Sequence, residues 1–156
     1  MVNTTDRIDW KLSTFKRLDI MILYKILQLR SEVFIVEQTC YYQDLDDKDE
    51  GSLHLMGWDR GHLVAYSRLL PKGISYPMSS SIGRVVTHSD YRGQGLGKEL
   101  MQLSIKHCEE QWPGDPIKIS AQTYLKEFYE DFGFTQCGEG YLEDGIPHIP
   151  MIRTPQ

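Results

Sequence analysis

A glycine-rich segment near residue 95 has the residue types and spacing best suited to binding phosphate. A β-branched run over residues 81–87 precedes it, and an amphipathic helical pattern follows it. The segment reads Arg92-Gly93-Gln94-Gly95-Leu96-Gly97-Lys98. Glycines let the backbone turn tightly and expose its N–H groups, because no Cβ shields them. The first helical turn adds unpaired N–H donors and the positive end of the helix dipole. We therefore expect residues 92–98, the phosphate loop, to cradle the phosphate oxygens of a cofactor.

The spacing within the phosphate loop excludes two common nucleotide-binding motifs. A Walker A loop would need glycine at the position of Arg92 and Ser or Thr at that of Glu99. A dinucleotide fingerprint, G-x-G-x-x-G, is one residue too long for Gly93, Gly95 and Gly97. The pattern that fits is R-x-x-G-x-G. A glycine-rich turn that only opens a helix is the alternative interpretation.

A second segment, over residues 122–134, strengthens the cofactor interpretation. It contains the pair Phe128-Tyr129 and, five residues further on, the pair Gly133-Phe134. Together the two segments resemble the cofactor motifs R-x-x-G-x-G and N-x-x-A-x-x-F-Y-x-x-x-G-F of the GCN5-related N-acetyltransferases, the GNAT family. Gln122 stands where the second motif usually has Asn, and Leu125 stands where it usually has Ala.

Further blocks of sequence narrow the resemblance to the ElaA-type branch of that family. They cover residues 29–38, 42–46, 82–85 and 143–149, so the likeness extends over nearly the whole chain. The resemblance implies acetyl-CoA, with coenzyme A as the carrier, and an N-acetyltransferase. The acetyl group would pass to an amine of a small molecule or peptide by direct attack in a ternary complex. An acyl-CoA-binding sensor or regulatory protein with this fold and little turnover is the alternative.

The resemblance also implies which residues hold the cofactor. The strand over residues 81–87 would splay from its neighbour and leave its main chain free for the pantetheine arm and the acyl carbonyl. The amide of Gln122 would contact the same arm. The implied cofactor-binding residues are Val85, Val86, Thr87, Arg92, Gly93, Gln94, Gly95, Leu96, Gly97, Lys98, Gln122 and Phe128.

Tyr129 and His148 are the candidate catalytic residues. Tyr129 matches the family position whose hydroxyl often donates to the departing sulfur, and a phenol is protonated at neutral pH. It also lies on an apolar helical stripe with Phe128 and Phe132, so a role in the core alone is the alternative. His148 could take the proton of the amine, because an imidazole exchanges protons near neutral pH. Glu37 and a water relay are the other candidates for that base.

The acceptor side has weaker signals. Glu37, Gln43 and Asp44 come from the segment that would border the acceptor pocket in this family, and Arg84 lies in a branch-like block. These four are the candidate substrate-binding residues. An acidic run over residues 44–50 would favour a cationic substrate if it formed a rim. A solvated polar loop is the alternative for that run.

Composition restricts the remaining possibilities. A net charge of −5 argues against a nucleic-acid surface, and no run approaches the ~20 apolar residues of a membrane span. The three cysteines lack the paired spacing of a zinc or redox site, and the acidic run lacks EF-hand spacing, so we expect no metal. Reduced thiols favour a cytoplasmic protein. We expect one acetyltransferase domain over residues 1–156, as a monomer or homodimer.

Periodicity predicts the elements that must position these residues. We expect strands over residues 8–12, 53–58, 62–70, 81–87, 117–121, 134–137 and 147–152. We expect helices over residues 18–37 and 124–132, and a third from Gly95 to the Trp112-Pro113 pair. The predicted fold is α/β, of the GNAT-like acyl-CoA N-acyltransferase type. It would have one mixed, mostly antiparallel central sheet with helices on both faces, as the resemblance also implies.

Overall fold

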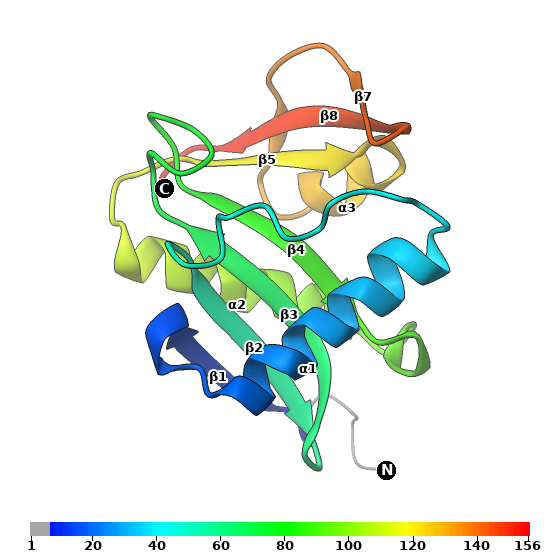
Figure 1. Cartoon of the computed structure of the whole chain (residues 1–156). Coiled ribbons are helices and arrows are strands. Elements are labelled where there is room, and N and C mark those ends of the chain that lie inside the picture. The colour runs from blue at the N-terminus through cyan, green and yellow to red at the C-terminus, as the bar shows by residue number, and fades with distance from the viewer. Residues whose placement is uncertain (1–6) are drawn as a thin grey trace.

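Two antiparallel sheets carry the fold in the computed structural model, which describes residues 7–156 (Figure 1). The first sheet has the strand order β1-β2-β3-β4, and the second has the order β5-β8-β6, with β7 also paired to β8. The first sheet comprises β1 (Asp9–Thr14), β2 (Leu53–Asp59), β3 (His62–Leu70) and β4 (Ser81–Thr87). The second comprises β5 (Ile117–Gln122), β6 (Thr135–Gln136), β7 (Tyr141–Glu143) and β8 (Ile146–Arg153).

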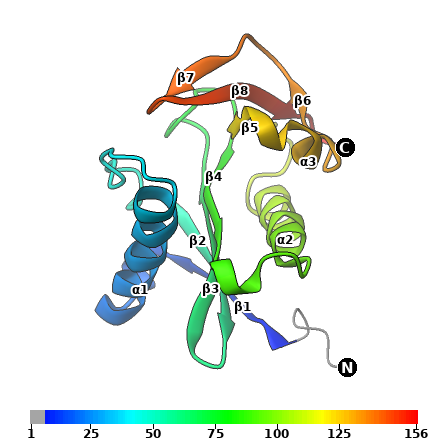
Figure 2. The same ribbon diagram turned by 90° about the vertical axis from the view of Figure 1, so that its right-hand side faces the viewer.

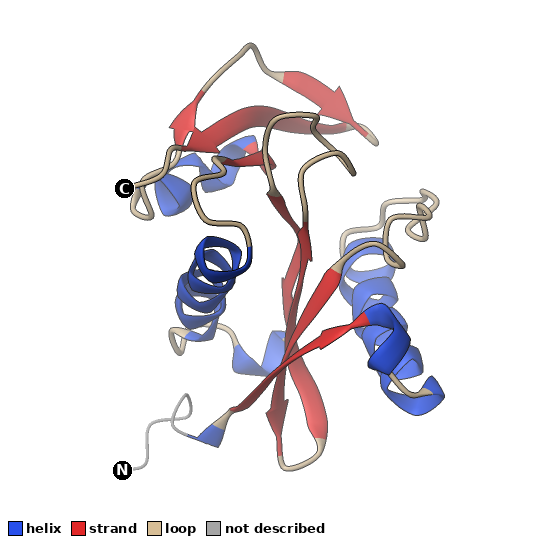
Figure 3. Cartoon of the chain, turned by 90° about the vertical axis from the view of Figure 1, so that its left-hand side faces the viewer, coloured by secondary structure: helices blue, strands red, loops and turns tan. Residues whose placement is uncertain are grey.

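Two long helices cover opposite faces of the first sheet, as expected. These are α1 (Ile20–Arg30), which continues as the π-helical segment η3 (Ser31–Glu37), and α2 (Leu96–Gln111). Figure 2 shows α1 and α2 on either side of β2, β3 and β4. Figure 3 shows the second sheet lying across one end of this layered arrangement. The shorter helical elements are η2 (Phe15–Arg17), η4 (Ser89–Tyr91), η5 (Thr123–Leu125) and α3 (Lys126–Glu130).

Local sequence accounts for the start of α1. Asp19 caps α1, because its side chain accepts a hydrogen bond from the backbone N–H of Ile22 at 2.8 Å. The helix expected over residues 18–37 is present, but its last part is the π-helical segment η3. The helix expected over residues 124–132 is shorter, since only Lys126–Glu130 is α-helical.

The apolar faces of both helices meet the sheet in buried clusters. In one cluster Leu96 and Leu100 of α2 pack with Leu55 and Ala65 of the sheet. Further along α2, Cys108 is buried in a second cluster, as its position on the apolar side of the helix predicts. On the other face, Ile26, Leu29 and Val33 form a third cluster with Met56, Tyr66 and Val86.

The predicted single sheet is divided between β4 and β5. These strands meet through a parallel bridge between Ser80 and Ile117, and Lys118 N donates to Ser80 O at 2.9 Å. Beyond this point the two strands diverge, as Figure 1 shows. The expected splay of the strand over residues 81–87 is thus confirmed, whereas the expectation of one continuous sheet is wrong.

The acidic run over residues 44–50 is only partly solvated, since Asp47 and Glu50 are exposed whereas Asp44 and Asp49 are buried. Three of its four aspartates pair with arginines. The ion pairs are Arg30 with Asp44 and Asp49, Arg68 with Asp46 and Asp49, and Arg84 with Asp44 and Asp46. Arg30 has no exposed surface. Neither interpretation of the run included these ion pairs, because the partner arginines are distant in sequence.

Residues 7–156 contain no helix long and apolar enough to pass through a membrane. Within the same residues, no group of three or more His, Cys, Asp or Glu side chains is arranged to hold a metal ion.

Candidate functional site

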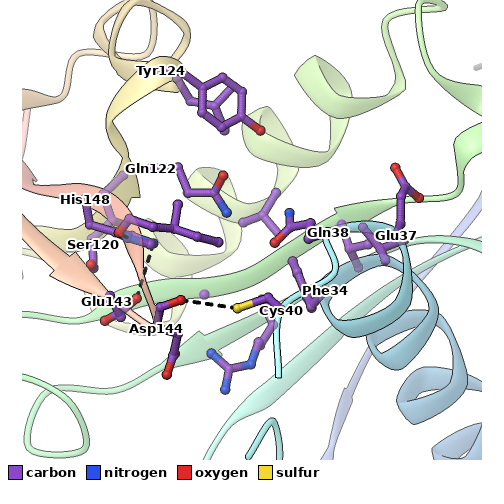
Figure 4. Close-up of a pocket in the computed structure, with 18 of the residues that line it drawn as sticks. Phe34, Glu37, Gln38, Cys40, Ser120, Gln122, Tyr124, Glu143, Asp144 and His148 are labelled. Carbon is purple, nitrogen blue, oxygen red and sulfur yellow. Dashed lines mark hydrogen bonds and ion pairs between the residues drawn. The ribbon is translucent and has the colours of Figure 1, made fainter. Parts of the chain in front are cut away.

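A cavity of about 530 Å³ opens where β4 and β5 diverge (Figure 4). We call it the β4–β5 cavity. Its walls come from both strands, from the end of η3 and from the turn between β7 and β8. Its volume lies within the range typical of sites for small molecules and cofactors.

One wall of the cavity is the free edge of β4. Val85, Val86 and Thr87 line it, as predicted. Arg68 pairs with Gly83 and Tyr66 with Val86, so Arg84 and Val85 together oppose the single residue Ser67. This β-bulge bends β4 away from regular pairing, and Arg84 has a φ of 48° there. Because β5 has already diverged, the main chain of β4 on this side is available to a ligand.

The phosphate loop lies at the end of this wall. Gly93 and Gly95 have φ values of 78° and 81°, which favour glycine, and Gly95 is the N-cap of α2. The first main-chain bond of the helix runs from Glu99 N to Gly95 O at 3.1 Å. The N–H groups of Leu96, Gly97 and Lys98 therefore have no acceptor within the helix.

Gly97, the last glycine of the motif, has open space beside it. A Cβ added there would meet no protein atom within 4 Å, and the residue has no positive φ that would require glycine. The fold itself therefore does not explain this glycine. A phosphate group close to the backbone would explain it, so the loop fits the cofactor that its motif predicts.

The residues of the phosphate loop differ in their position relative to the cavity. Arg92 lines the β4–β5 cavity, whereas residues 93–98 lie beyond its wall. The side chain of Leu96 is buried in the core, so only its main chain can contact a ligand. For Leu96 the predicted binding role is thus limited to the backbone N–H.

Arg92 is ion-paired with Glu37, which joins two residues predicted for different roles. Arg92 Nη1 pairs with Glu37 Oε1, and Nη2 donates to Glu37 Oε2 at 3.2 Å and to the carbonyl of Thr87 at 3.2 Å. The hydrogen bond from Arg92 holds the pKa of Glu37 below its usual value. Glu37 thus lies beside the phosphate loop, where sequence analysis had placed it on the acceptor side.

Gln122 and His148 meet on the opposite wall. They are register partners on β5 and β8, and both line the cavity. His148 Nδ1 lies 2.7 Å from Ile146 O and must carry the proton, because a carbonyl only accepts. His148 Nε2 lies 3.3 Å from a carboxylate oxygen of Glu143 (Figure 4). Ile146 O therefore orients the imidazole through Nδ1, and Glu143 can accept from Nε2 only when the ring carries a second proton.

Tyr129 lies both in the core and on the wall of the cavity. Its side chain is largely buried, at 8 % exposure, and packs edge-on against Phe128 and Phe134 at 5.2 and 6.0 Å between ring centroids. It also lines the β4–β5 cavity. Burial raises the pKa of Tyr129 to about 12, so its hydroxyl keeps its proton at neutral pH. Phe128, predicted to contact cofactor, packs in the core and does not line the cavity.

Two of the predicted acceptor-side residues are not on the cavity wall. Gln43 and Asp44 do not line it, and the Asp44 carboxylate accepts from Arg30 at 2.9 Å and from Arg84 at 2.8 Å. The substrate-binding role predicted for Asp44 is therefore corrected to a structural one. Arg84 does line the cavity, but its guanidinium is held by Asp44 and lies 5.7 Å from the ring centre of Tyr42.

Several residues of the cavity were missed by sequence analysis. They include Cys40, Tyr42 and Tyr124, together with Glu143 and Asp144 in the turn before β8. Cys40 Sγ donates to the carbonyl of Asp144 at 3.3 Å and so ties the loop after η3 to that turn. The block over residues 143–149 carried the signal for Glu143, but only His148 had been assigned a role from it.

Comparisons with known proteins support the resemblance to the GNAT family. Residues 19–155 match the domain family described as acetyltransferase (GNAT) domain. The chain is 42 % identical over 148 residues to protein ElaA of Escherichia coli, which covers 94 % of this chain and 96 % of that protein.

Solved structures show the same likeness. An acyl-CoA N-acyltransferase from Pseudomonas aeruginosa superposes with a TM-score of 0.90 at 44 % identity, covering 94 % of this chain and 99 % of that chain. An aminoglycoside 6'-N-acetyltransferase complexed with coenzyme A shares the fold, with a TM-score of 0.68 at 17 % identity over 92 % of this chain and 96 % of that chain.

Proposed function

Because the chain belongs to the GNAT acetyltransferase family and to its ElaA-type branch, we propose that it is an acetyl-CoA-dependent N-acyltransferase. The observation that carries the proposal is the β4–β5 cavity, which extends from the phosphate loop residue Arg92 to Tyr129 and His148. The acceptor is the amine of a small molecule or peptide. A single acetyltransferase domain accounts for this activity.

The same proposal names the protein groups that would hold the cofactor. The N–H groups of Leu96, Gly97 and Lys98, with the guanidinium of Arg92, would bind the pyrophosphate. The free edge of β4 and the amide of Gln122 would bind the pantetheine arm. When bound, acetyl-CoA supplies an activated thioester. The relative of this fold complexed with coenzyme A supports that choice.

Three protein groups would then act on the reacting atoms. A main-chain N–H of β4 would donate to the acyl oxygen and stabilise the negative charge that develops there. His148 would take the proton that the attacking amine loses, and Glu143 would stabilise the resulting imidazolium. Tyr129 Oη would donate its proton to the departing sulfur. In this transfer a C–N bond forms and the C–S bond breaks. One proton leaves the amine, and another reaches the thiolate.

A second candidate is an acyl-CoA-binding sensor with little turnover. The surroundings of His148 favour it, because Glu143 lies 3.3 Å from Nε2, the nitrogen that would have to take the proton of the amine. The enzymatic function requires an amine to reach Nε2 beside the half-exposed side chain of Glu143.

Two measurements separate these functions. Calorimetry with acetyl-CoA, with ATP and NADH as controls, tests the cofactor class. Thiol release in the presence of a panel of amines then tests turnover. We expect saturable binding of acetyl-CoA alone and amine-dependent thiol release. Binding without thiol release for any amine would favour the sensor, and no binding by folded protein would exclude both.

We also propose the cytoplasm as the compartment. The three cysteines, all within the described residues, are free, and thiols persist in a reducing environment.

A further inference from the structure

The ion pair between Glu37 and Arg92 joins η3 to the phosphate loop, two segments that border the β4–β5 cavity. Glu37 is the last residue of η3, and Arg92 opens the phosphate loop 55 residues later. Two guanidinium nitrogens face the two carboxylate oxygens, which is the forked geometry of strong arginine–carboxylate pairs. Both residues line the β4–β5 cavity.

Another anion could nevertheless replace Glu37 as the partner of Arg92. The side chains of Arg92 and Glu37 are 43 % and 39 % exposed, so water screens their attraction. Nothing packs over them as the core packs over Arg30. A stronger anion could therefore displace the carboxylate at little cost.

The pyrophosphate expected in the phosphate loop is such an anion. It would carry two negative charges to the position of Arg92, and guanidinium binds phosphate with the same forked geometry as carboxylate. If Glu37 kept its place, its charge would repel the pyrophosphate at short range. The carboxylate and the cofactor therefore compete for one cation.

This inference rests on the proposed function, since it needs coenzyme A in the phosphate loop. We propose that Glu37 is a built-in competitor of the cofactor: it holds Arg92 in the free protein, yields it to the pyrophosphate, and thereby weakens cofactor binding so that coenzyme A leaves readily after transfer. Glu37 is thus a positioning residue at the cofactor end.

Glu37→Gln tests the proposal, because it removes the charge and keeps the shape. Calorimetry should show coenzyme A binding about two- to fivefold more tightly than to the wild type, the range expected for losing one exposed competing pair. Most of the gain should appear as slower dissociation. Glu32→Gln is the matched control, because Glu32 is an exposed residue of the same segment and lines a different cavity. Its effect on coenzyme A should be negligible.

Pantetheine, which lacks the pyrophosphate, is the control ligand. Its affinity should be the same for the wild type and for Glu37→Gln. Weaker coenzyme A binding by Glu37→Gln would mean that Glu37 prepares Arg92 for the cofactor, and unchanged binding would mean that the pair has no influence. Either result overturns the inference, as would an equal gain in Glu32→Gln or with pantetheine. Failure of both wild type and variant to bind coenzyme A would instead overturn the proposed function.

Discussion

The buried guanidinium of Arg30 donates through Nε to the carboxylate of Asp44 at 2.9 Å, and so joins the first helix to the loop before β2. The other oxygen of the same carboxylate accepts from Arg84 at 2.8 Å. Asp44 therefore links the interior of the fold to the wall of the β4–β5 cavity. The position of Arg84 on that wall depends on charges that lie outside the cavity.

Arg30→Met should destabilise the protein by about 3 kcal/mol, because it leaves Asp44 and Asp49 partly buried with fewer compensating cations. Urea unfolding measures this free energy. Lys25→Met is the control, since Lys25 is an exposed residue of the same helix, and its effect should stay within about 0.5 kcal/mol. A loss below about 1 kcal/mol for Arg30→Met would show that the network contributes little.

His54 should make the protein less stable as the pH falls below about 6.5. Burial lowers the pKa of His54, and Arg30 and Arg68 disfavour its charge further. The unfolded chain then binds a proton that the folded protein refuses, so the free energy of unfolding decreases as pH falls below the unfolded pKa. The contribution of His54 is complete above that value. The lowered pKa values of Asp46 and Asp49 act in the same direction, at lower pH.

Unfolding measured from pH 7.5 to 5 checks this, with His54→Asn compared to the wild type. His54 Nε2 must donate to Asp49 O at 2.9 Å, so Nδ1 accepts from the Tyr66 hydroxyl at 2.7 Å. The variant should be less stable but should show a flatter pH dependence. The exposed His62, replaced by Asn, should leave the slope unchanged. An equal slope in wild type and His54→Asn contradicts the assignment.

Gly97→Ala should separate cofactor binding from folding. A Cβ at this position meets no protein atom within 4 Å, so the variant should be as stable as the wild type or up to about 1 kcal/mol more stable. Affinity for coenzyme A should fall about tenfold, because the methyl group occupies the space of a phosphate oxygen. Gln102→Ala, on the exposed side of the same helix, is the control for calorimetry. Gly95 is unsuitable for this test, since its φ of 81° requires glycine for the fold itself.

Tyr129→Phe should lower kcat about 100-fold and change the Kd of acetyl-CoA less than about twofold. The ring and its contacts with Phe128 and Phe134 remain, and only the hydroxyl that we propose as the proton donor is lost. The measurement is thiol release with an accepted amine, beside calorimetry on the same preparation. An unchanged kcat would leave Tyr129 as a core residue only.

His148→Asn should lower kcat/KM by about 100-fold if the imidazole takes the proton of the amine. Glu143→Gln should have a smaller effect of the same sign, because it removes the charge 3.3 Å from Nε2 but leaves the base. Initial rates across pH 6 to 9 measure both variants. Activity that persists in His148→Asn with the wild-type pH profile would assign the proton transfer to water.

Much of the fold could be predicted because its signals are local. The cap at Asp19, the positive φ of Gly93 and Gly95 and the apolar side of α2 each depend on residues within one or two turns. The same holds for the cofactor motifs, since a phosphate loop is a short stretch of backbone with its own glycines. The family, the order of the elements and the conformation of the glycine-rich loop follow from such stretches.

The partners of the residues expected on the acceptor side depend on tertiary structure. Asp44, expected to face substrate, is held by Arg30 and Arg84, and Glu37, expected there too, pairs with Arg92. Charged residues in a sequence show that ion pairs are possible. Which carboxylate meets which guanidinium depends on burial and on contacts between residues 14 to 55 positions apart. Only folding brings those residues together, because the packing of α1 and β4 around the loop places each carboxylate within reach of its arginine partners.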